Sequence, residues 1–149
     1  MRVLVWQWGR RGAGPRYAVE LAAGLRGVPG VEALLSLHRS EGFGLVPAEA
    51  MLLGRPGVAT GWSGNMDFMD ADSAALVPFT LVPAQDPRGV LEVPGAVWAE
   101  PDIAVAEQAL RQLADDPATR AALGARGQAK ARASPGVESL AAALRGFTA

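Results

Sequence analysis

The sequence has no cysteine, which excludes disulfide bonds, thiolate zinc sites and a cysteine nucleophile. His38 is the single histidine, which argues against a histidine metal cluster and against a Ser-His-Asp triad. No apolar run approaches the roughly 20 residues that a membrane-spanning helix needs. The first apolar run is also too short for a signal-peptide core and leads into Arg10 and Arg11. We therefore expect a cytoplasmic protein with no transmembrane segment and no metal site.

Charged residues are also few: they make up 19% of the chain, against 50% hydrophobic residues. This balance is typical of a globular protein rather than of a disordered one. The formal net charge of −1 provides no field that would attract nucleic acid or an acidic membrane surface. A chain of 149 residues can form one hydrophobic core, so we predict a single domain over residues 1–149.

The first 37 residues have the pattern of a strand, a helix and a second strand. Arg2 to Trp6 is a short apolar run that predicts a buried strand, and a glycine-rich turn from Gly9 to Pro15 follows it. A helix is expected from Arg16 to about Leu25, and Val31 to Leu37 predicts the next strand. Such a unit pairs its strands in parallel. The fold class we expect is therefore α/β, with a single Rossmann-like parallel sheet flanked by helices.

The alternation continues before the chain becomes mainly helical. After a polar loop, we predict a helix that has Pro47 in its first turn and ends at Gly54, then short strands at 58–60 and 75–77. The prolines between residues 83 and 101 predict a long surface loop. Helices are expected over residues 102–114, 117–133 and 135–147, with Asp102 as the first N-cap. The predicted apolar face of the first of these helices consists of Ile103, Ala106, Ala109, Leu110 and Leu113.

One segment, from His38 to Met51, carries a pattern with chemical meaning. It leads from a strand end through a glycine-containing loop to the start of a helix, where backbone N–H groups and the helix dipole favour an anion such as a diphosphate. Gly42 and Gly44 have no Cβ, so the main chain can approach a ligand closely. Glu49, on the helix, can accept hydrogen bonds from a vicinal diol such as a ribose, and Glu41, on the loop, can reach a second polyol.

Glu41 and Glu49, with seven residues between them, resemble the paired-glutamate signature of retaining family 4 glycosyltransferases of the GT-B type. The similarity continues through residues 54–60 and 63–65, which look like that family's next strand and loop. Residues 98–102 look like the lead-in to its closing helices. The resemblance implies a nucleotide-diphosphate sugar as donor substrate, hexosyl transfer with retention to an unknown acceptor, and no cofactor.

The resemblance also implies roles for individual residues. Glu41 would be the catalytic-site carboxylate that holds the sugar, together with the main chain of Gly42, Phe43 and Gly44. The amides of Leu45 and Val46 would meet the phosphates, and Glu49 would hold the ribose. The alternative is structural: an acidic residue that suits a helix dipole, with Glu49 solvated.

Further candidates lie near this segment. Arg10 and Gly12 belong to a glycine-rich turn that resembles the GT-B loop facing the donor phosphates, although a plain turn with solvated arginines is the alternative. His38, at a strand end, is a candidate for contact with the donor sugar. Asp67 and Asp70 fit no metal-binding loop, so we predict a solvated or helix-capping role for them. Four tryptophans are interpreted mainly as packing residues, with one of them, Trp62, as a candidate to border the sugar.

The resemblance is not continuous. Residues 1–37 resemble the opening strand, helix and strand of the family's N-terminal domain, whereas residues 38–149 resemble the back half of its C-terminal, nucleotide-sugar-binding domain. It therefore implies an internally shortened enzyme without most of the acceptor domain and without the Arg and Lys pair that neutralises the departing diphosphate. Three hypotheses stay open: glycosyl transfer, with a homo-oligomer or other partner completing the cleft; donor binding without turnover; and a structural or interaction domain. We expect transfer by the isolated chain to be extremely slow or absent.

Overall fold

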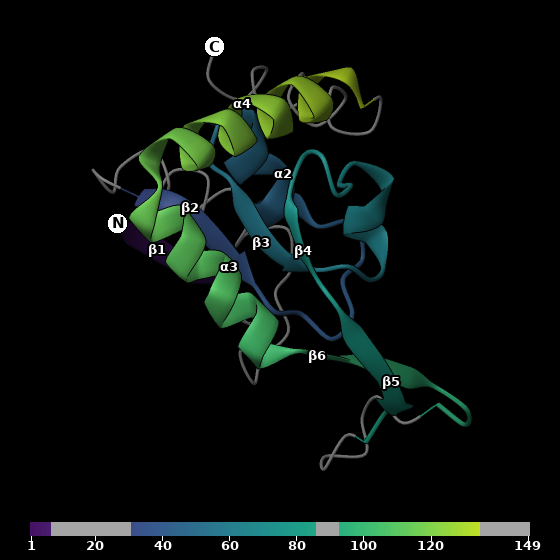
Figure 1. Cartoon of the computed structure of the whole chain (residues 1–149). Coiled ribbons are helices and arrows are strands. Elements are labelled where there is room, and N and C mark those ends of the chain that lie inside the picture. The colour runs from purple at the N-terminus through teal and green to yellow at the C-terminus, as the bar shows by residue number, and fades with distance from the viewer. Residues whose placement is uncertain (7–30, 86–92, 135–149) are drawn as a thin grey trace.

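Four short strands form a parallel sheet in the order β1-β2-β3-β4 (Figure 1). They are β1 (Arg2–Trp6), β2 (Val31–Ser36), β3 (Gly57–Thr60) and β4 (Ala75–Val77). The computed structural model describes residues 1–6, 31–85 and 93–134. The α/β class and the positions of these strands are confirmed. The prediction that β1 is buried was wrong: Val5 is 62% exposed and Val3 and Leu4 are only partly buried, because β1 is the first strand in the order and pairs on one side with β2. The helix predicted from Arg16, the turn before it and the helix predicted over 135–147 lie outside the described residues.

Helices cover both faces of this sheet. α2 (Leu45–Leu52) lies behind the sheet in Figure 1 and α3 (Ile103–Asp115) lies in front of it. Alternate residues of the buried strand β3 point to the two faces: Ala59 packs with Met51 of α2, whereas Val58 packs with Leu113 of α3. This alternation is the period of two expected of a strand, and it explains why β3 is buried along its whole length.

The predicted apolar face of α3 is correct except at its start. Ala106 and Leu113 are buried, but Ile103 is 60% exposed. Ile103 is the first residue of the helix and follows Asp102, whose carboxylate accepts hydrogen bonds from the backbone of Ala104 and Val105. The predicted N-cap is therefore confirmed, whereas Ile103 and its neighbours Asp102 and Ala104 lie in solvent.

A second, antiparallel pair of strands was not predicted. β5 (Phe79–Pro83) and β6 (Val97–Pro101) form a hairpin that projects from the body of the molecule (Figure 1). The prediction of one sheet, and of a surface loop reaching to residue 101, was therefore wrong. Proline cannot donate a ladder hydrogen bond, but Pro83 and Pro101 occupy the terminal pairs of the hairpin, where a missing donor does little harm.

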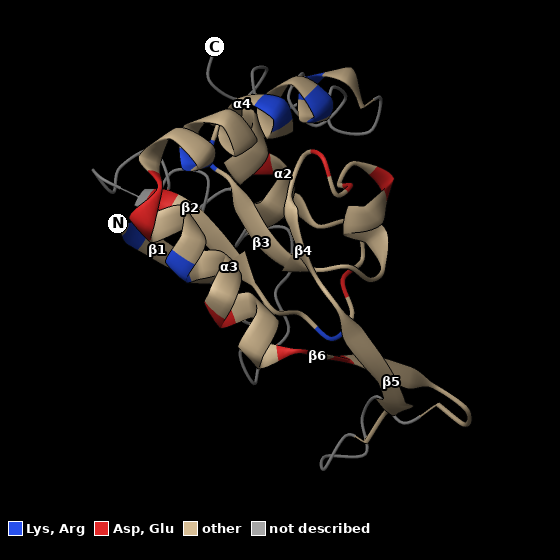
Figure 2. Cartoon of the chain, in the orientation of Figure 1, with Lys and Arg blue, Asp and Glu red and all other residues tan. Residues whose placement is uncertain are grey.

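The last described helix, α4 (Pro117–Ala133), has the predicted boundaries but an unexpected mode of packing. It has no continuous apolar stripe, and basic residues are distributed along it (Figure 2). Gly124 and Gly127 let it approach the backbone: a Cβ on Gly124 would collide with the Gly54 carbonyl oxygen. Close packing of main chain on main chain thus adds to the apolar contacts of α4, which come from Leu123 and Ala131.

Polar side chains complete the attachment of α4. Arg126 Nε donates to the carbonyl of Asp72 at 2.7 Å, and Gln128 Nε2 donates to the carbonyl of Leu52 at 2.8 Å. Arg120 forms an ion pair of 3.2 Å with Glu32. Among the basic residues of α4, Arg120 and Arg126 therefore help to attach this helix. In the described part of the chain, no helix has the length and apolar character needed to cross a membrane.

Candidate functional site

Two loops meet at the carboxyl edge of the parallel sheet, the edge at which open α/β sheets generally bind ligands. The motif loop (residues 38–44) leaves β2 and enters α2, and the clasp turn (residues 61–65) leaves β3. The backbone N–H of Gly64 donates to the carbonyl of Glu41 at 3.2 Å. A Cβ on Gly64 would collide with the carbonyl of Gly42. The two loops therefore touch through their main chains, as the glycines in both permit.

The start of α2 has backbone amides that the helix itself leaves without an acceptor. Gly44 is the N-cap, and no side chain caps the helix or places a negative charge in its first turn. The helical ladder begins with the Ala48 N–H, which donates to the Gly44 carbonyl at 2.9 Å. Because Pro47 has no N–H, the amides without an acceptor inside the helix are those of Gly44, Leu45 and Val46. These include both amides predicted to meet phosphate.

The two glycines of the motif loop have different physical roles. Gly44 has φ +87°, and a Cβ there would lie 3.1 Å from Cβ of Asn65 and 3.2 Å from the Phe68 ring. Its conformation and its packing thus both require glycine. Gly42 has neither constraint, since a Cβ built on it meets nothing within 4 Å. Gly42 is exposed, so the space beside it is open to solvent.

Glu41 lies half-buried between the loops. Its backbone N–H donates to Ser63 Oγ at 3.2 Å, and its carbonyl accepts from the Ser63 hydroxyl at 2.5 Å. Its own carboxylate accepts from the Gly42 N–H at 3.2 Å. The main chain of Glu41 is therefore held firmly, whereas most of the acceptor capacity of its carboxylate is available to other donors.

Glu49 is far less accessible than a solvated helix acid. Its exposed fraction is 4%, and it lies on α2 among residues that are themselves buried. The structural alternative that left Glu49 in solvent is therefore wrong. Burial of a carboxylate in this position requires specific polar surroundings, because transfer of an unpaired charge out of water is very unfavourable.

His38 is a buried residue whose ring joins the two loops. Its Nε2 contacts two acceptors, the carbonyl of Trp62 at 2.9 Å and Oδ1 of Asn65 at 3.0 Å, so this nitrogen carries the proton. Nδ1 then accepts from the hydroxyl of Ser36 at 3.2 Å. With an exposed fraction of 3%, the ring directs both nitrogens toward protein atoms. The contact with a donor sugar that we predicted for His38 remains a prediction, and the geometry gives it a structural role as well.

Asn65 and Ser63 belong to the site although the sequence did not predict roles for them. Asn65 is fully buried and donates through Nδ2 to the carbonyl of Thr60 at 3.1 Å, so its carboxamide connects β3 to His38. Ser63 has φ 78° and ψ −154°, a region that normally requires glycine and costs a residue with a side chain on the order of 1–3 kcal/mol. The string Ser63-Gly64-Asn65 was visible in the sequence, but neither the strain nor the contacts can be read from it.

Aromatic residues of both loops pack against other aromatic rings. Phe43 packs against Phe68 with ring centroids 5.3 Å apart, and Trp62 packs against Phe79 at 5.1 Å. The Trp62 indole is thus engaged at the base of the hairpin, as its interpretation as a packing residue anticipated. Arg39 lies over the Trp98 ring, with its guanidinium carbon 5.7 Å from the ring centroid, and forms an ion pair with Glu100.

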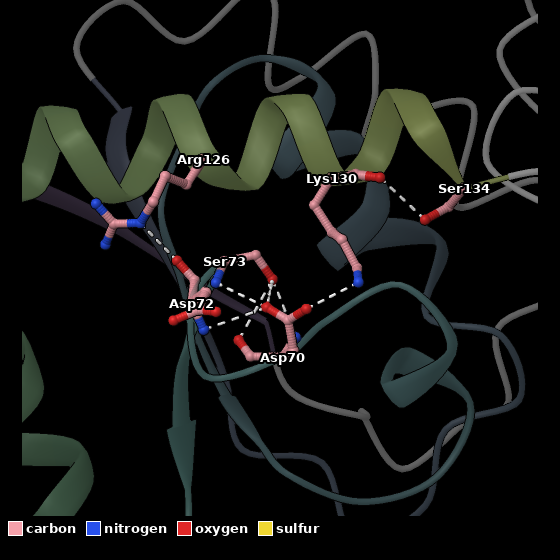
Figure 3. Close-up of polar contacts among 6 residues, drawn as sticks. All are labelled: Asp70, Asp72, Ser73, Arg126, Lys130 and Ser134. Atoms are coloured by element: carbon pink, nitrogen blue, oxygen red, sulfur yellow. Dashed lines mark hydrogen bonds and ion pairs between the residues drawn. The ribbon is translucent and has the colours of Figure 1, made fainter.

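Asp67, the last residue of η1 (Gly64–Asp67), and Asp70, three residues later, have different surroundings. Asp67 is exposed, whereas Asp70 accepts from Ser73 and forms an ion pair of 2.8 Å with Lys130 (Figure 3). Hydrogen bonds from Lys130 and then Ser73 lower the pKa of Asp70 from 3.8 to about 2. No group of three potential metal ligands occurs among residues 1–6, 31–85 and 93–134.

Of the predicted site residues, the structure brings Glu41, Gly42, Phe43, Gly44, Leu45 and Val46 together with Glu49 and His38 on one loop and helix. Arg10 and Gly12 lie outside the described residues. Compared with known protein families the chain matches no family model, and a comparison with curated proteins gives no significant match. The resemblance to family 4 glycosyltransferases therefore rests on the residues quoted for it.

Proposed function

We propose that this chain binds a nucleotide-diphosphate sugar at the start of α2 and belongs functionally with the retaining glycosyltransferases. The observation that carries the proposal is the conformation of the motif: its glutamates flank a helix start with three amides that lack acceptors within the helix and with no acidic group in the first turn. A diphosphate suits these amides and the positive end of the helix dipole. In this arrangement the sugar would contact the motif loop.

In this proposal each carboxylate has one role. Glu41, half-buried beside the open space at Gly42, accepts hydrogen bonds from sugar hydroxyl groups. Glu49, on α2, is the carboxylate assigned to the ribose hydroxyl groups; because it is 4% exposed, this role requires its side chain to become accessible when the donor binds. In transfer, the bond from the anomeric carbon to the diphosphate breaks, a bond from that carbon to a hydroxyl oxygen of the acceptor forms, and the hydroxyl proton passes to the departing diphosphate. The amides of Leu45 and Val46 would stabilise the negative charge that develops on the diphosphate.

A second candidate is donor binding without transfer. The distribution of positive charge favours it: Arg39, the basic side chain within the motif loop, is paired with Glu100 and directed at Trp98. The described residues near the start of α2 therefore supply amides rather than a cationic pair for the departing diphosphate. Product formation from a labelled nucleotide sugar separates the two candidates.

Thermal denaturation with UDP-glucose, GDP-mannose and ADP-glucose, and with UDP, GDP and ADP, tests the binding step. At a ligand concentration of 100 times Kd, binding contributes about 2.7 kcal/mol to the free energy of unfolding, which raises Tm by several degrees in a chain of this size. Glu49→Gln should remove the shift by both the nucleoside diphosphate and the nucleotide sugar. Glu41→Gln should mainly reduce the additional shift given by the sugar. If none of the six compounds raises Tm, the proposed function is wrong.

A further inference from the structure

The main chain of Ser63 adopts a conformation that glycine would adopt more easily. Among the described residues it is the one non-glycine position with positive φ, at 78° with ψ −154°. Its neighbour Gly64 is a glycine for a clear reason, the contact with the Gly42 carbonyl. Strain of this kind persists only where the surroundings hold the residue in place, and it is concentrated at functional sites. The serine side chain must therefore contribute something that glycine at position 63 would not.

That contribution is a pair of hydrogen bonds to the main chain of one residue of the motif loop, Glu41. Ser63 Oγ accepts from the N–H of Glu41 at 3.2 Å and donates to the carbonyl of the same residue at 2.5 Å. The Gly64 N–H donates to this carbonyl as well, at 3.2 Å. The peptide groups on both sides of Glu41 are thus fixed, and with them the direction of its Cα–Cβ bond.

The clasp turn is itself held by hydrogen bonds to β3 and to His38. Asn65 donates to the carbonyl of Thr60 at 3.1 Å and accepts from His38 Nε2 at 3.0 Å, while His38 also donates to the carbonyl of Trp62 at 2.9 Å. These three contacts tie the end of β2 to the turn that follows β3. These contacts fix the position of the turn that carries Ser63. The hydroxyl of Ser63, in turn, fixes the position of the Glu41 main chain in the motif loop.

We propose that Ser63 is a positioning residue that aims the Glu41 carboxylate at the sugar of the donor. This inference rests on the proposed function of the same site. Ser63 does not need to touch the donor, because its hydroxyl is used by the main chain of Glu41. The nucleoside diphosphate, which would bind at the start of α2, should depend on Ser63 much less than the sugar does.

The substitution Ser63→Gly separates positioning from stability. It removes the hydroxyl and relieves the strain together, so Tm should stay within a few degrees of the wild-type value, whereas Ser63→Ala keeps the strained conformation and should lower Tm. In Ser63→Gly, the Kd for whichever of UDP-glucose, GDP-mannose and ADP-glucose binds the wild type should rise about tenfold. The Kd for the matching diphosphate should change less than twofold. Ser134→Gly is the matched control, because Ser134 also donates to a main-chain carbonyl, that of Lys130 at 3.0 Å, but at the end of α4.

A ligand-free measurement completes the test. The amide of Glu41 should exchange with solvent faster in Ser63→Gly than in the wild type, since its acceptor has been removed, and Ser134→Gly should leave that rate unchanged. Unchanged exchange at Glu41, or equal affinity of wild type and Ser63→Gly for the nucleotide sugar, overturns the positioning role while leaving the proposed function intact. If the wild type binds none of the nucleotide sugars, the proposed function is wrong, and so is the proposal that Ser63 positions Glu41 for a donor sugar. The exchange rate then still decides whether Ser63 holds the loop.

Discussion

Lys130 and Asp70 form an ion pair of 2.8 Å that joins α4 to the turn before β4 (Figure 3). Lys130 is the only lysine of the chain, and its partner also accepts hydrogen bonds from the N–H and the hydroxyl of Ser73. The Asp70 carboxylate thus organises its own turn and holds the helix above it. The stability of this attachment should consequently depend on pH.

The first prediction concerns acid. Because the pKa of Asp70 is lowered to about 2 in the folded protein, its ionised form stabilises the fold above about pH 4, and this contribution is lost as the pH falls from about 4 through 2. Asp70→Asn should lower Tm by about 2–4 °C at pH 7, since both side chains are 44% exposed and solvent screening limits the pair to about 1 kcal/mol. Thermal denaturation from pH 7 to pH 2 should show the difference shrinking toward zero. Lys130→Met should converge with the wild type over the same range, and a constant difference down to pH 2 would contradict the assignment.

The second prediction concerns the contact of Gly124 with Gly54. Glycine in a helix interior is normally less favourable than alanine by about 1 kcal/mol, so Gly124→Ala would ordinarily stabilise α4. Here the added Cβ would meet the Gly54 carbonyl, and we expect a net destabilisation of about 1–3 kcal/mol, measured by urea denaturation. The reverse substitution at the exposed neighbour, Ala125→Gly, should cost only the propensity difference. A gain in stability by Gly124→Ala would mean that α4 does not approach Gly54 so closely.

The third prediction separates the two glycines of the motif loop. Gly44→Ala should lower the free energy of unfolding by about 1–2 kcal/mol, because alanine is unfavourable at positive φ. Gly42→Ala should change it by less than about 0.5 kcal/mol, since the added methyl group meets no protein atom. Under the proposed function, Gly42→Ala should nevertheless reduce the Tm shift produced by the nucleotide sugar. Retention of the full shift in a stably folded Gly42→Ala variant would place the donor elsewhere.

The fourth prediction compares two attachments of the hairpin to the motif loop. Arg39 pairs with Glu100, but the side chains are 51% and 46% exposed, so Arg39→Gln should alter the free energy of unfolding by at most about 1 kcal/mol. The N–H of Ala99, which is buried, donates to the Arg39 carbonyl at 3.0 Å. Ala99→Pro removes that donor from β6 and should destabilise the protein clearly more. Urea denaturation of both variants, with Glu100→Gln as a second test of the ion pair, checks the order.

The sequence predicted the strands and helices that carry regular apolar patterns or clear caps. The boundaries of α4 and the cap at Asp102 followed from the residues themselves, whereas the strand at Val97–Pro101 was obscured by prolines that turned out to lie at the ends of a hairpin. In the site, the glycines and glutamates of the motif were recognisable. The roles of Ser63, Asn65 and His38 were not, because they depend on contacts between segments more than 20 residues apart.

The way α4 is attached has a consequence for comparisons among related sequences. Arg126 and Gln128 donate to main-chain carbonyls that lie 54 and 76 residues away along the chain. A carbonyl is present whatever side chain its residue carries, so substitutions at Asp72 or Leu52 neither break these bonds nor require a compensating change on the helix. Correlated substitution, the signal from which contacts are inferred in alignments, should therefore be weak across this interface. It should be concentrated at the two pairs of side chains that recognise each other by charge, Asp70 with Lys130 and Glu32 with Arg120.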